Sequence, residues 1–340
     1  MPRGWPRSRP RLLLVKISSL GDVVANLPVV TDILRRWPDA QIDWVVEEAF
    51  IDIPRLHPGI ATVIPVAQRR WREMRVSAGT LAQRCAFFTR LRATRYDFVL
   101  DTQGLFKSAI IAAGAQGPSS GYDWGSAREP LATVFYNRRL SVPKGLHAIE
   151  RNRRLAAAAL GYTLDGPAEY SLSLPSAPTI VPASPYCVLV HGSSREDKLW
   201  PEEHWIAVGQ ALATRGLKIV LPWGSGNEHV RSTRMAAAIP GACVPERLGL
   251  SEIAGLLCAA RLVVGVDTGL THLAAASRVP VVGLYLGSDP RLTGVCGETW
   301  HSNLGARGAQ LSVATVLTAI EPLLHRWQEF ARICALYARS

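Results

Sequence analysis

The stretch RLVVGVDTGLTHLAAA, residues 261–276, decides the fold of this chain. It begins with an apolar, valine-rich run at 262–266 that has the length of a buried strand. The polar residues 267–269 follow, and the small residues after them have helical spacing. A buried strand that leads through a short loop into a helix is the repeating unit of a parallel sheet covered by helices. We therefore expect an α/β protein.

The same pattern recurs along the chain on both sides of residues 261–276. Four prolines between residues 175 and 185 suit an extended connector, so we place a domain boundary there. The sequence predicts two tandem Rossmann-like domains, 1–175 and 176–320, and a C-terminal helix, 321–340, with the first domain as one candidate surface for its packing. Pro322 is expected to divide residues 312–338 into a pair of helices. Expected strands cover residues 11–17, 41–48, 61–66, 96–104, 186–194, 218–224, 261–269 and 279–287, and expected helices cover 23–37, 70–95, 107–115, 202–215, 228–238, 251–260 and 270–277.

Composition excludes several classes of protein. With 340 residues, of which 48% are apolar and 19% charged, the chain can bury large cores, so disorder and coiled coil fit poorly. No apolar stretch approaches the roughly 20 residues that span a bilayer. Only four apolar residues separate the basic start from Lys16, too few for a secretory signal, and the six cysteines lack metal-site spacing. We expect a cytoplasmic protein with reduced thiols and no metal site.

Positive charge is concentrated in the first half of the chain. Residues 1–175 carry 24 Lys and Arg against 15 Asp and Glu, whereas residues 176–340 carry 14 against 12. Arginines cluster within 69–75 and 151–154, so the first domain is expected to face an anionic partner. Nucleic acid, a phosphorylated ligand and an acidic membrane surface all satisfy this charge. A solvated, arginine-rich helix face satisfies it equally.

Loops that follow strands are the candidate sites, because ligands of open α/β sheets bind at the carboxyl ends of the strands. Asp22 follows the first expected strand and is either an acid–base group or a helix N-cap. Ser193, Ser194 and Lys198 follow a strand of the second domain. Their hydroxyls and mobile cation suit a phosphate, and a surface lysine beside a capping serine is the alternative.

Two further loops carry a carboxylate and a helix start. Glu228 either binds the paired hydroxyls of a ribose or stabilises a helix dipole. Residues 267–272 aim unpaired amides at whatever lies before the helix, as anion sites do, and Gly269 permits close approach. Asp267 as a helix cap and His272 as a packed core residue are the alternatives. Neither G-x-G-x-x-G nor the P-loop motif is present.

Taken together, these loops resemble the bacterial lipopolysaccharide heptosyltransferases of the ADP-heptose transferase group, glycosyltransferase family 9. The likeness covers about residues 11–330 and is closest to the heptosyltransferase I branch. It rests on the segments VKISSLGDVVANLP (15–28), RRWR (69–72), DTQGLFKSA (101–109), REPLATVFYNR (128–138), SSREDKLWP (193–201) and DTGLTHLAAA (267–276). The resemblance implies a GT-B fold, in which two Rossmann-like domains face a cleft.

The resemblance also implies substrates and residue roles. The second domain is expected to bind ADP-L-glycero-β-D-manno-heptose, and the first the Kdo (3-deoxy-D-manno-octulosonate) sugars of lipid A. Asp22 is the implied general base. Implied donor contacts are Ser193, Ser194, Lys198, Glu228, Asp267, Thr268, Gly269, Thr271 and His272, and implied acceptor contacts are Lys16, Arg69, Arg70, Arg72, Gln103, Lys107 and Arg128.

A single displacement with inversion follows from these roles. Asp22 removes the proton of an acceptor hydroxyl as it attacks the anomeric carbon, while ADP leaves from the opposite face. Amides at Gly269 and beyond, together with Lys198, stabilise the departing diphosphate, so neither a metal nor another cofactor is expected. The surplus arginines bind an acidic glycolipid at the inner face of the bacterial inner membrane, where we expect peripheral contact.

Two other functions stay open. Heptosyltransferase II or another GT-B sugar transferase would keep the donor loops and differ in the first domain. A basic nucleic-acid-binding protein without enzymatic activity is the remote alternative, and we expect no nucleic-acid partner. Asp101 either shares in acid–base work or only ends a strand.

Overall fold

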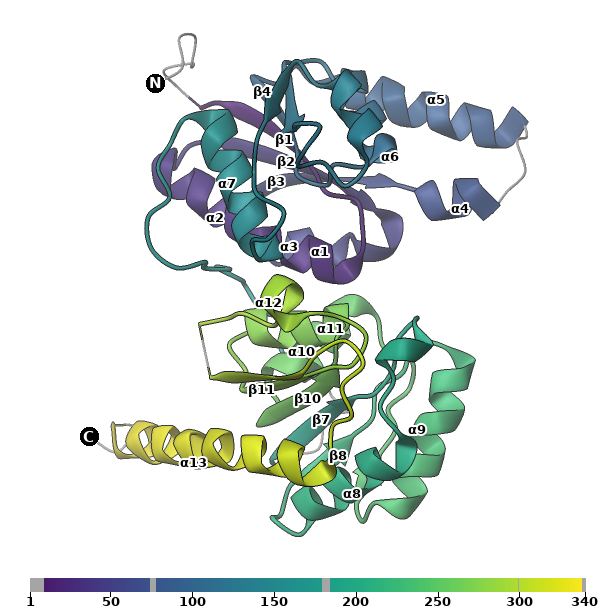
Figure 1. Ribbon diagram of the computed structural model, residues 1–340, viewed down its shortest axis with the longest axis vertical. Coiled ribbons are helices and arrows are strands. Elements are labelled where there is room, and N and C mark those ends of the chain that lie inside the picture. The colour runs from purple at the N-terminus through teal and green to yellow at the C-terminus, as the bar shows by residue number, and fades with distance from the viewer. Residues whose placement is uncertain (1–8, 74–77, 179–183, 299, 338–340) are drawn as a thin grey trace. The chain divides into compact units, whose positions relative to one another are not determined.

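The chain forms two compact units, unit 1 at Met1–Ser173 and unit 2 at Leu174–Ser340. This computed structural model describes residues 9–73, 78–178, 184–298 and 300–337, without the side chains of 326–337 (Figure 1). The sequence predicts the boundary after residue 175, in the same proline-rich connector. Arg75 of the arginine cluster and the N-terminal arginines before residue 9 lie outside the described residues.

Unit 1 contains one six-stranded parallel sheet in the order β3-β2-β1-β4-β5-β6. Its central strand β1 pairs with β2 on one side and with β4 on the other, and its residues 12–15 are fully buried. This strand order is that of the Rossmann fold. The strands are β1 (Arg11–Val15), β2 (Gln41–Glu47), β3 (Ile60–Val66), β4 (Phe98–Asp101), β5 (Ser119–Tyr122) and β6 (Arg138–Leu140).

The helices of unit 1 differ from the prediction in two places. The expected helix 23–37 is two helices, because Pro28 lacks an N–H and fits the first turn of a new helix. The expected helix 70–95 is also two, α4 and α5, with residues 74–77 outside the described residues. The helices are α1 (Leu20–Val24), α2 (Leu27–Arg36), α3 (Asp52–Arg55), α4 (Gln68–Glu73), α5 (Ala78–Arg92), α6 (Phe106–Gly114) and α7 (Ala148–Leu160), and the 3₁₀-helices are η1 (Glu48–Phe50) and η2 (Pro130–Phe135).

Unit 2 repeats the same topology. Its six parallel strands lie in the order β12-β11-β10-β7-β8-β9, which is the order of unit 1 viewed from the other end. The strands are β7 (Tyr186–Val190), β8 (Lys218–Val220), β9 (Ala242–Cys243), β10 (Leu262–Val266), β11 (Val281–Tyr285) and β12 (His301–Gly305). The helices are η3 (Glu196–Lys198), α8 (Glu202–Ala213), α9 (Gly226–Ala238), α10 (Leu250–Cys258), α11 (Gly269–Ala276), α12 (Pro290–Thr293) and α13 (Val313–Tyr337).

The prediction of two terminal helices separated at Pro322 is wrong. Residues 313–337 form one helix, α13, with Pro322 inside it. A proline removes one backbone hydrogen bond from a helix. Ile320 and Leu323, on either side of it, are buried in the core of unit 2, and this packing holds the helix together through the proline. Packing of residues 321–340 on unit 1 stays a prediction.

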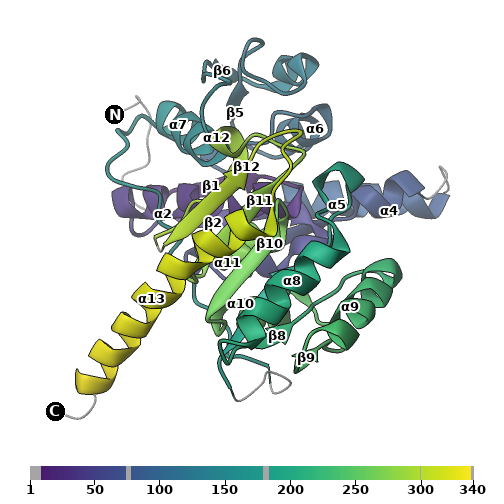
Figure 2. The same ribbon diagram turned by 60° about the horizontal axis from the view of Figure 1, so that its bottom comes forward.

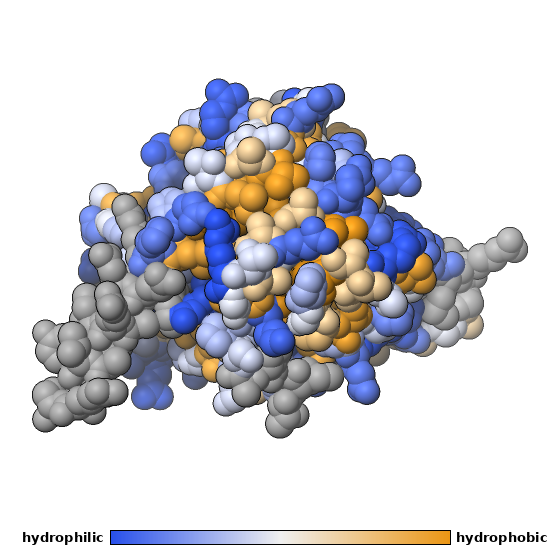
Figure 3. Space-filling view, turned by 90° about the horizontal axis from the view of Figure 1, so that it is seen from below, coloured by the Kyte–Doolittle hydropathy of each residue, from blue (hydrophilic) through white to orange (hydrophobic). Residues whose placement is uncertain are grey.

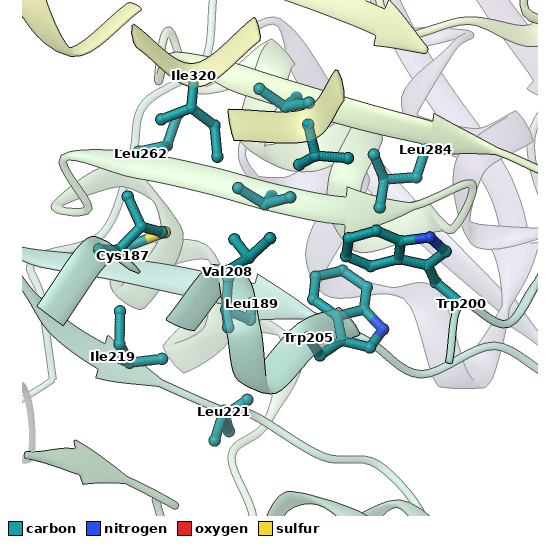
Figure 4. Packing of buried hydrophobic residues seen from close by; sticks show 14 of the residues in the cluster. Cys187, Leu189, Trp200, Trp205, Val208, Ile219, Leu221, Leu262, Leu284 and Ile320 are labelled. Carbon is teal, nitrogen blue, oxygen red and sulfur yellow. The ribbon is translucent and has the colours of Figure 1, made fainter. Parts of the chain in front are cut away.

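One hydrophobic core of unit 2 lies between its sheet and the helices α8 and α13, which lie in front of the sheet in Figure 2. Figure 4 shows Cys187 and Ile219 of the strands at one end of this core and two tryptophans at the other. The rings of Trp200 and Trp205 meet edge to face, with centroids 5.2 Å apart. Seen from below, apolar residues gather in the middle of the face that carries α8 and α13 (Figure 3).

Candidate functional site

Each unit brings its predicted site residues to the switch point of its own sheet. In unit 1 the chain winds in opposite directions from β1 and β4; Asp22 follows the first strand, and Gln103 and Lys107 follow the second. In unit 2 the equivalent strands are β7 and β10, followed by Lys198 and Asp267. Ligands of open α/β sheets bind at this position. Each unit therefore has its own candidate site.

Asp22 lies in the first turn of α1. The N-cap of this helix is Ser19, and Asp22 occupies the third helical position, so Asp22 is not the N-cap itself. Its Oδ2 accepts hydrogen bonds from the Ser19 backbone N–H at 2.9 Å and from the Ser19 hydroxyl at 3.0 Å. Among the described residues no donor reaches Oδ1. One oxygen of the carboxylate therefore supports the helix start, and the other is available to a substrate hydroxyl.

Gln103 fixes the backbone of the loop that carries Asp22. Its Oε1 accepts the N–H of Ile17 at 2.6 Å and that of Ser18 at 3.3 Å, and its Nε2 donates to the Ser18 carbonyl at 2.5 Å. Lys107 donates from Nζ to the Ser18 hydroxyl at 3.2 Å. Both side chains are thus engaged with the β1–α1 loop. The ammonium of Lys107 has further protons to donate.

Lys16 is buried at the end of β1. Its ammonium donates to the Thr102 carbonyl at 2.9 Å and to Asn152 Oδ1 at 3.4 Å. Burial lowers the pKa of Lys16, while the negative charges of Asp22 and Asp101 act in the opposite direction. Lys16 therefore places a cation close to the Asp22 carboxylate.

Lys16 and Asp22 both line a pocket of about 70 Å³. The guanidinium of Arg151 lies over the Tyr122 ring, 4.8 Å from its centroid, and donates to the Ser126 carbonyl at 2.7 Å. The other lining residues are Thr102, Gln103, Tyr122, Arg128, Ala148, Arg151 and Asn152. The pocket thus combines one carboxylate with several cations, which suits an anionic sugar that must also lose a proton.

Asp101 is engaged within the protein. Its Oδ1 accepts the N–H of Gln103 at 2.8 Å and that of Gly104 at 3.3 Å, and its Oδ2 accepts the Tyr136 hydroxyl at 2.7 Å. Burial raises the pKa of Asp101, although the hydrogen bond from Tyr136 acts against it. Since both oxygens are occupied in a fully buried position, the geometry favours the structural alternative for Asp101.

Arginines implied as acceptor contacts also lie on α4, away from the pocket. Arg70 donates from Nε and Nη2 to the two carboxylate oxygens of Glu48, at 3.1 and 3.0 Å. Arg69 and Arg72 lie near Lys107: burial lowers the pKa of that lysine, and the charges of both arginines lower it further. None of these three arginines lines the pocket beside Asp22. The structure therefore brings Arg128, but not the α4 arginines, to that pocket.

In unit 2, Asp267 gathers three polar side chains at the end of β10. Its Oδ2 accepts from Lys198 Nζ at 2.6 Å and from the Ser288 hydroxyl at 2.5 Å, and its Oδ1 lies 3.2 Å from His272 Nε2. Burial raises the pKa of Asp267, but the interactions with His272, Lys198 and Ser288 outweigh it and hold the pKa well below its usual range. The carboxylate is therefore charged and holds Lys198 and His272 close together.

Helix α11 starts directly after this cluster. Thr268 is its N-cap, and the Thr268 side chain makes no capping hydrogen bond. The N–H groups of Thr271 and His272 donate to the Thr268 carbonyl. In the described part of the chain, the N–H groups of Gly269 and Leu270 have no acceptor. Two free amides at a helix start form an anion site.

Thr271 contributes to this site from inside the protein. It is fully buried, and its hydroxyl donates to the Val266 carbonyl at 2.6 Å. Gly265 on β10 makes this contact feasible, because a Cβ at that position would lie 2.3 Å from Thr271 Oγ1. The side chain thus ties α11 to the sheet.

Glu228 connects the start of α9 with the loop after β7. Its Oε2 accepts the N–H of Gly224 at 2.7 Å and that of Ser225, the N-cap, at 3.1 Å. A Cβ at Gly192 would lie 2.3 Å from Glu228 Oε1, so the glycine permits this approach. The carboxylate caps the helix with one oxygen and presents the other to the β7 loop.

The two serines after β7 have different environments. Ser193 Oγ accepts the N–H of Arg195 at 3.2 Å, which closes a turn of the loop. Ser194 is exposed. Both precede η3, which carries Lys198 toward Asp267. The unit 2 predictions therefore converge on one region, with Glu228 beside Gly192 of the same β7 loop.

Sequence reasoning missed several residues of both sites. Ser288 directly follows the expected strand 279–287, so the rule that located the other loops could have found it. Arg151 was noted only as a member of the arginine cluster 151–154, and Asn152 was not noted. Both lie on α7, more than a hundred residues from Lys16, and no local pattern connects them with β1. Tyr122 ends β5, a strand that has too few apolar residues to be predicted.

The described residues contain neither a cluster of metal-ligating side chains nor a candidate membrane-spanning helix. Within them, no group of three or more His, Cys, Asp or Glu side chains is arranged to hold a metal ion. No helix in the same ranges has both the length and the apolar character required to cross a bilayer. A reaction without a metal stays a prediction.

Comparison with known proteins identifies relatives. A family model described as glycosyltransferase family 9 (heptosyltransferase) matches residues 84–316. Lipopolysaccharide heptosyltransferase 1 of Escherichia coli K12 is 44% identical over 293 residues, which cover 85% of this chain and 91% of that protein. Lipopolysaccharide heptosyltransferase 1 of Pseudomonas aeruginosa PAO1 is 45% identical over 291 residues, which cover 85% and 82%. The resemblance found in the sequence is confirmed.

Solved structures agree with these relatives. E. coli heptosyltransferase WaaC with ADP matches with a TM-score of 0.84 at 41% identity, and WaaC with ADP-2-deoxy-2-fluoro heptose with 0.83 at 42%; each match covers 92% of this chain and 99% of the other. E. coli ADP-heptose LPS heptosyltransferase II matches with 0.74 at 21% identity, over 94% of this chain and 99% of the other, which shows the fold alone. The expected fold class, two parallel-sheet α/β domains of the GT-B type, is confirmed.

Proposed function

This chain belongs to glycosyltransferase family 9 (heptosyltransferase) and transfers heptose in the synthesis of the lipopolysaccharide inner core, and we propose that Asp22 is its general base. The proposed reaction moves L-glycero-D-manno-heptose from ADP-heptose to a Kdo residue of Kdo-lipid A, with inversion. The observation that carries the proposal of a diphosphate donor is the helix start of α11, where two free amides lie beside Lys198 and His272.

The unit 2 site supplies what a diphosphate leaving group needs. Free N–H groups of Gly269 and Leu270 donate to phosphate oxygens, and Lys198 adds a positive charge that counts most when the bond to ADP breaks. The WaaC structures contain ADP and an ADP-heptose analogue, which supports an ADP-sugar in this unit. Asp267 is negatively charged and would repel a phosphate. We therefore assign it to holding Lys198 and His272 rather than to a direct donor contact.

Glu228 is the proposed ribose contact. One of its oxygens already accepts two backbone N–H groups, which fixes the carboxylate at the start of α9. A fixed carboxylate after a strand holds the paired hydroxyls of a ribose in dinucleotide folds. Ser193 and Ser194 of the facing loop are proposed contacts of the phosphates.

The unit 1 pocket supplies the acceptor side. Oδ1 of Asp22 takes the proton of the attacking Kdo hydroxyl as that oxygen bonds to the anomeric carbon. The bond from the anomeric carbon to the diphosphate breaks in the same step, and ADP leaves with its electron pair. Lys16, Arg128 and Arg151 line the pocket and are proposed to bind the acidic acceptor sugar. Gln103 keeps the loop of Asp22 in place.

The acceptor of heptosyltransferase I is favoured over the alternatives. The chain is 44% identical to E. coli heptosyltransferase 1 but 22% identical to E. coli heptosyltransferase 3 and 21% to the structure of heptosyltransferase II. We propose that the protein is cytoplasmic and contacts the inner leaflet of the inner membrane peripherally, and that it binds no nucleic acid.

A mass-spectrometric transfer assay tests this function. The full chain is incubated with ADP-heptose and either Kdo-lipid A or an acceptor that already carries its first heptose. We expect one heptose added to Kdo-lipid A. Addition only to the heptosylated acceptor would assign the chain to heptosyltransferase II, and no transfer to either acceptor would reject the proposal.

A further inference from the structure

An apolar patch is exposed on unit 1, on the helix that follows the acceptor loop. Phe106 and Ile110 of α6 are 45% and 38% exposed, and Leu131 and Val134 of η2 are 61% and 58% exposed. Single exposed apolar side chains are normal on soluble proteins. Here four such side chains lie on two helices that contact each other, and apolar side chains gathered in this way mark interaction sites. We call these four residues the apolar patch.

The four residues of the apolar patch lie on two helices, at spacings that place each pair on one helix face. Phe106 and Ile110 are four residues apart, on one face of an α-helix, and Leu131 and Val134 are three apart, on one face of a 3₁₀-helix. The two helices contact each other, and the ring of Phe106 meets that of Phe135 edge to face at 5.3 Å. The other face of η2 is buried, so the exposed face is rigidly held.

The surroundings of the patch are basic. The segments 102–118 and 119–140 contain two acidic residues, Asp123 and Glu129, and the Oε2 of Glu129 accepts the Phe106 N–H at 2.6 Å, at the start of α6. The basic residues of the two segments are Lys107, Arg128, Arg138 and Arg139. The three arginines are exposed. An anionic surface therefore complements the charge around the patch.

We propose that the apolar patch docks this enzyme on an anionic lipid bilayer. The four side chains enter the boundary between headgroups and acyl chains, and the neighbouring arginines meet lipid phosphates; stable peripheral binding needs both contributions. Trp124, 59% exposed in the loop before η2, has the side chain that is enriched at such boundaries. The inference rests on the proposed function, because acyl chains hold a Kdo-lipid A acceptor in a membrane.

The position of the patch connects docking with catalysis. Phe106 is the first residue of α6, and the next residue, Lys107, donates to Ser18 in the loop that carries Asp22. Arg128, which lines the pocket beside Asp22, lies three residues before Leu131. Docking through the patch therefore holds the acceptor pocket close to the headgroup layer, where the sugar of a glycolipid lies.

Vesicle flotation with the full chain tests the docking. The vesicles contain either phosphatidylethanolamine with phosphatidylglycerol or only phosphatidylcholine. We expect wild type to bind the anionic vesicles more tightly than the neutral ones, and Leu131→Ser with Val134→Ser to lower the partition coefficient at least about tenfold. Val230→Ser is the matched control, because Val230 is 54% exposed on α9 of unit 2 and should leave binding unchanged. All these positions are exposed, so the unfolding temperatures should match wild type.

The rate of heptose transfer distinguishes a loss of membrane docking from a loss of catalysis. The double variant should lose transfer to Kdo-lipid A in vesicles and keep transfer to a deacylated, water-soluble acceptor. Vesicle binding that is unchanged in the double variant would overturn the proposal. So would a wild-type dimer that the double variant converts to a monomer without loss of vesicle binding, since the patch would then bind a second copy. If wild type uses neither acceptor, the proposed function fails, whereas flotation still decides the docking.

Discussion

At the scale of the residue, Asp22 divides its two oxygens between helix support and the acceptor side. Asp22→Asn keeps an oxygen that can accept the Ser19 N–H but removes the base. We expect turnover to fall at least about a hundredfold, the lower range for a positioned base, with ADP affinity unchanged. Steady-state kinetics and calorimetry measure the two effects. Ser19→Ala removes only the hydroxyl bond and is the control; turnover of Asp22→Asn within a few-fold of wild type would exclude Asp22 as the base.

Lys198 is expected to matter for donor binding as well as chemistry. Its ammonium is held 2.6 Å from Asp267, beside the free amides of α11. A charge-assisted hydrogen bond is worth about 1.5–3 kcal/mol, so Lys198→Ala should lower the affinity for ADP at least about tenfold, as measured by calorimetry. Lys218→Ala, at an exposed position of the same unit, should leave the affinity unchanged. Equal affinities for wild type and Lys198→Ala would contradict the phosphate assignment.

Buried His57 makes the stability of unit 1 depend on pH. Its Nδ1 accepts the Gly59 N–H at 3.0 Å and its Nε2 lies 3.0 Å from the Thr31 hydroxyl, so the folded protein holds a neutral ring. Burial lowers the pKa of His57 to about 4, against about 6.5 in an unfolded chain. The contribution of the neutral His57 ring to the free energy of unfolding is therefore complete above pH 6.5 and is lost as the pH falls toward 4.

Between pH 7 and pH 5 this loss amounts to about 2 kcal/mol of unfolding free energy. Denaturant unfolding of wild type and of His57→Gln at the two pH values measures it. The variant should lose less stability on acidification than wild type. Identical losses in both proteins would show that His57 titrates in the same way in the folded and unfolded chain.

At the scale of the element, the height of α11 over the sheet depends on one glycine of β10. A Cβ at Gly265 would lie 2.3 Å from Thr271 Oγ1 and 3.0 Å from Val190 Cβ. Gly265→Ala should push α11 outward and destabilise the protein by about 1–3 kcal/mol. It should also lower the affinity for ADP, because the free amides move with the helix. Thermal unfolding and calorimetry test this. Gly145→Ala is the control, since its Cβ would meet nothing within 4 Å; equal effects of the two changes would refute the argument.

The elements also show what a sequence can predict. Strands β1, β7 and β10 are short apolar runs, and the loops after them hold Asp22, Lys198 and Asp267, so the strand pattern located these residues. Gln103, after β4, was implied only by the family resemblance. Strands β5, β6 and β12, with the sequences SSGY, RRL and HSNLG, escaped prediction because pairing with a neighbouring strand, and not their own hydrophobicity, keeps them in the sheet. The place of the α7 residues in the pocket escaped prediction because they approach β1 only in the folded chain.

One local arrangement recurs in both units. Asp22 and Glu228 each occupy the third position of a helix and accept the N–H of a serine N-cap with one oxygen. In the sequence, capping and catalysis are alternatives for Asp22, and stabilisation of a helix dipole and ribose binding are alternatives for Glu228. The structure makes them compatible, because a carboxylate has two oxygens and the cap fixes the direction of the second. A residue at a helix start can therefore serve the fold and the reaction together.

At the scale of the whole molecule, two sheets of the same topology each have a core and a switch-point site of their own. A ligand that binds only one site of the folded protein stabilises the unit that contains it, by about 2.7 kcal/mol at a hundred times its Kd. With unit 2 as the donor unit, ADP should slow amide hydrogen exchange most in β7, β10 and α11. A soluble Kdo saccharide should slow exchange most in β1, α1 and α7.

Hydrogen-exchange mass spectrometry on the full chain resolves these segments. The Lys198→Ala variant, at the same ADP concentration, should show weaker ADP-dependent protection, about 1.4 instead of 2.7 kcal/mol for a tenfold higher Kd, whereas its response to the Kdo saccharide should equal that of wild type. Protection by ADP that is greater at residues 11–24 than at 262–276 would reverse the assignment of donor and acceptor to the two units. That outcome would not change the fold or the family. Both units have the same topology, so each has a switch point that can bind a ligand, and the side chains after the strands decide which ligand each switch point binds.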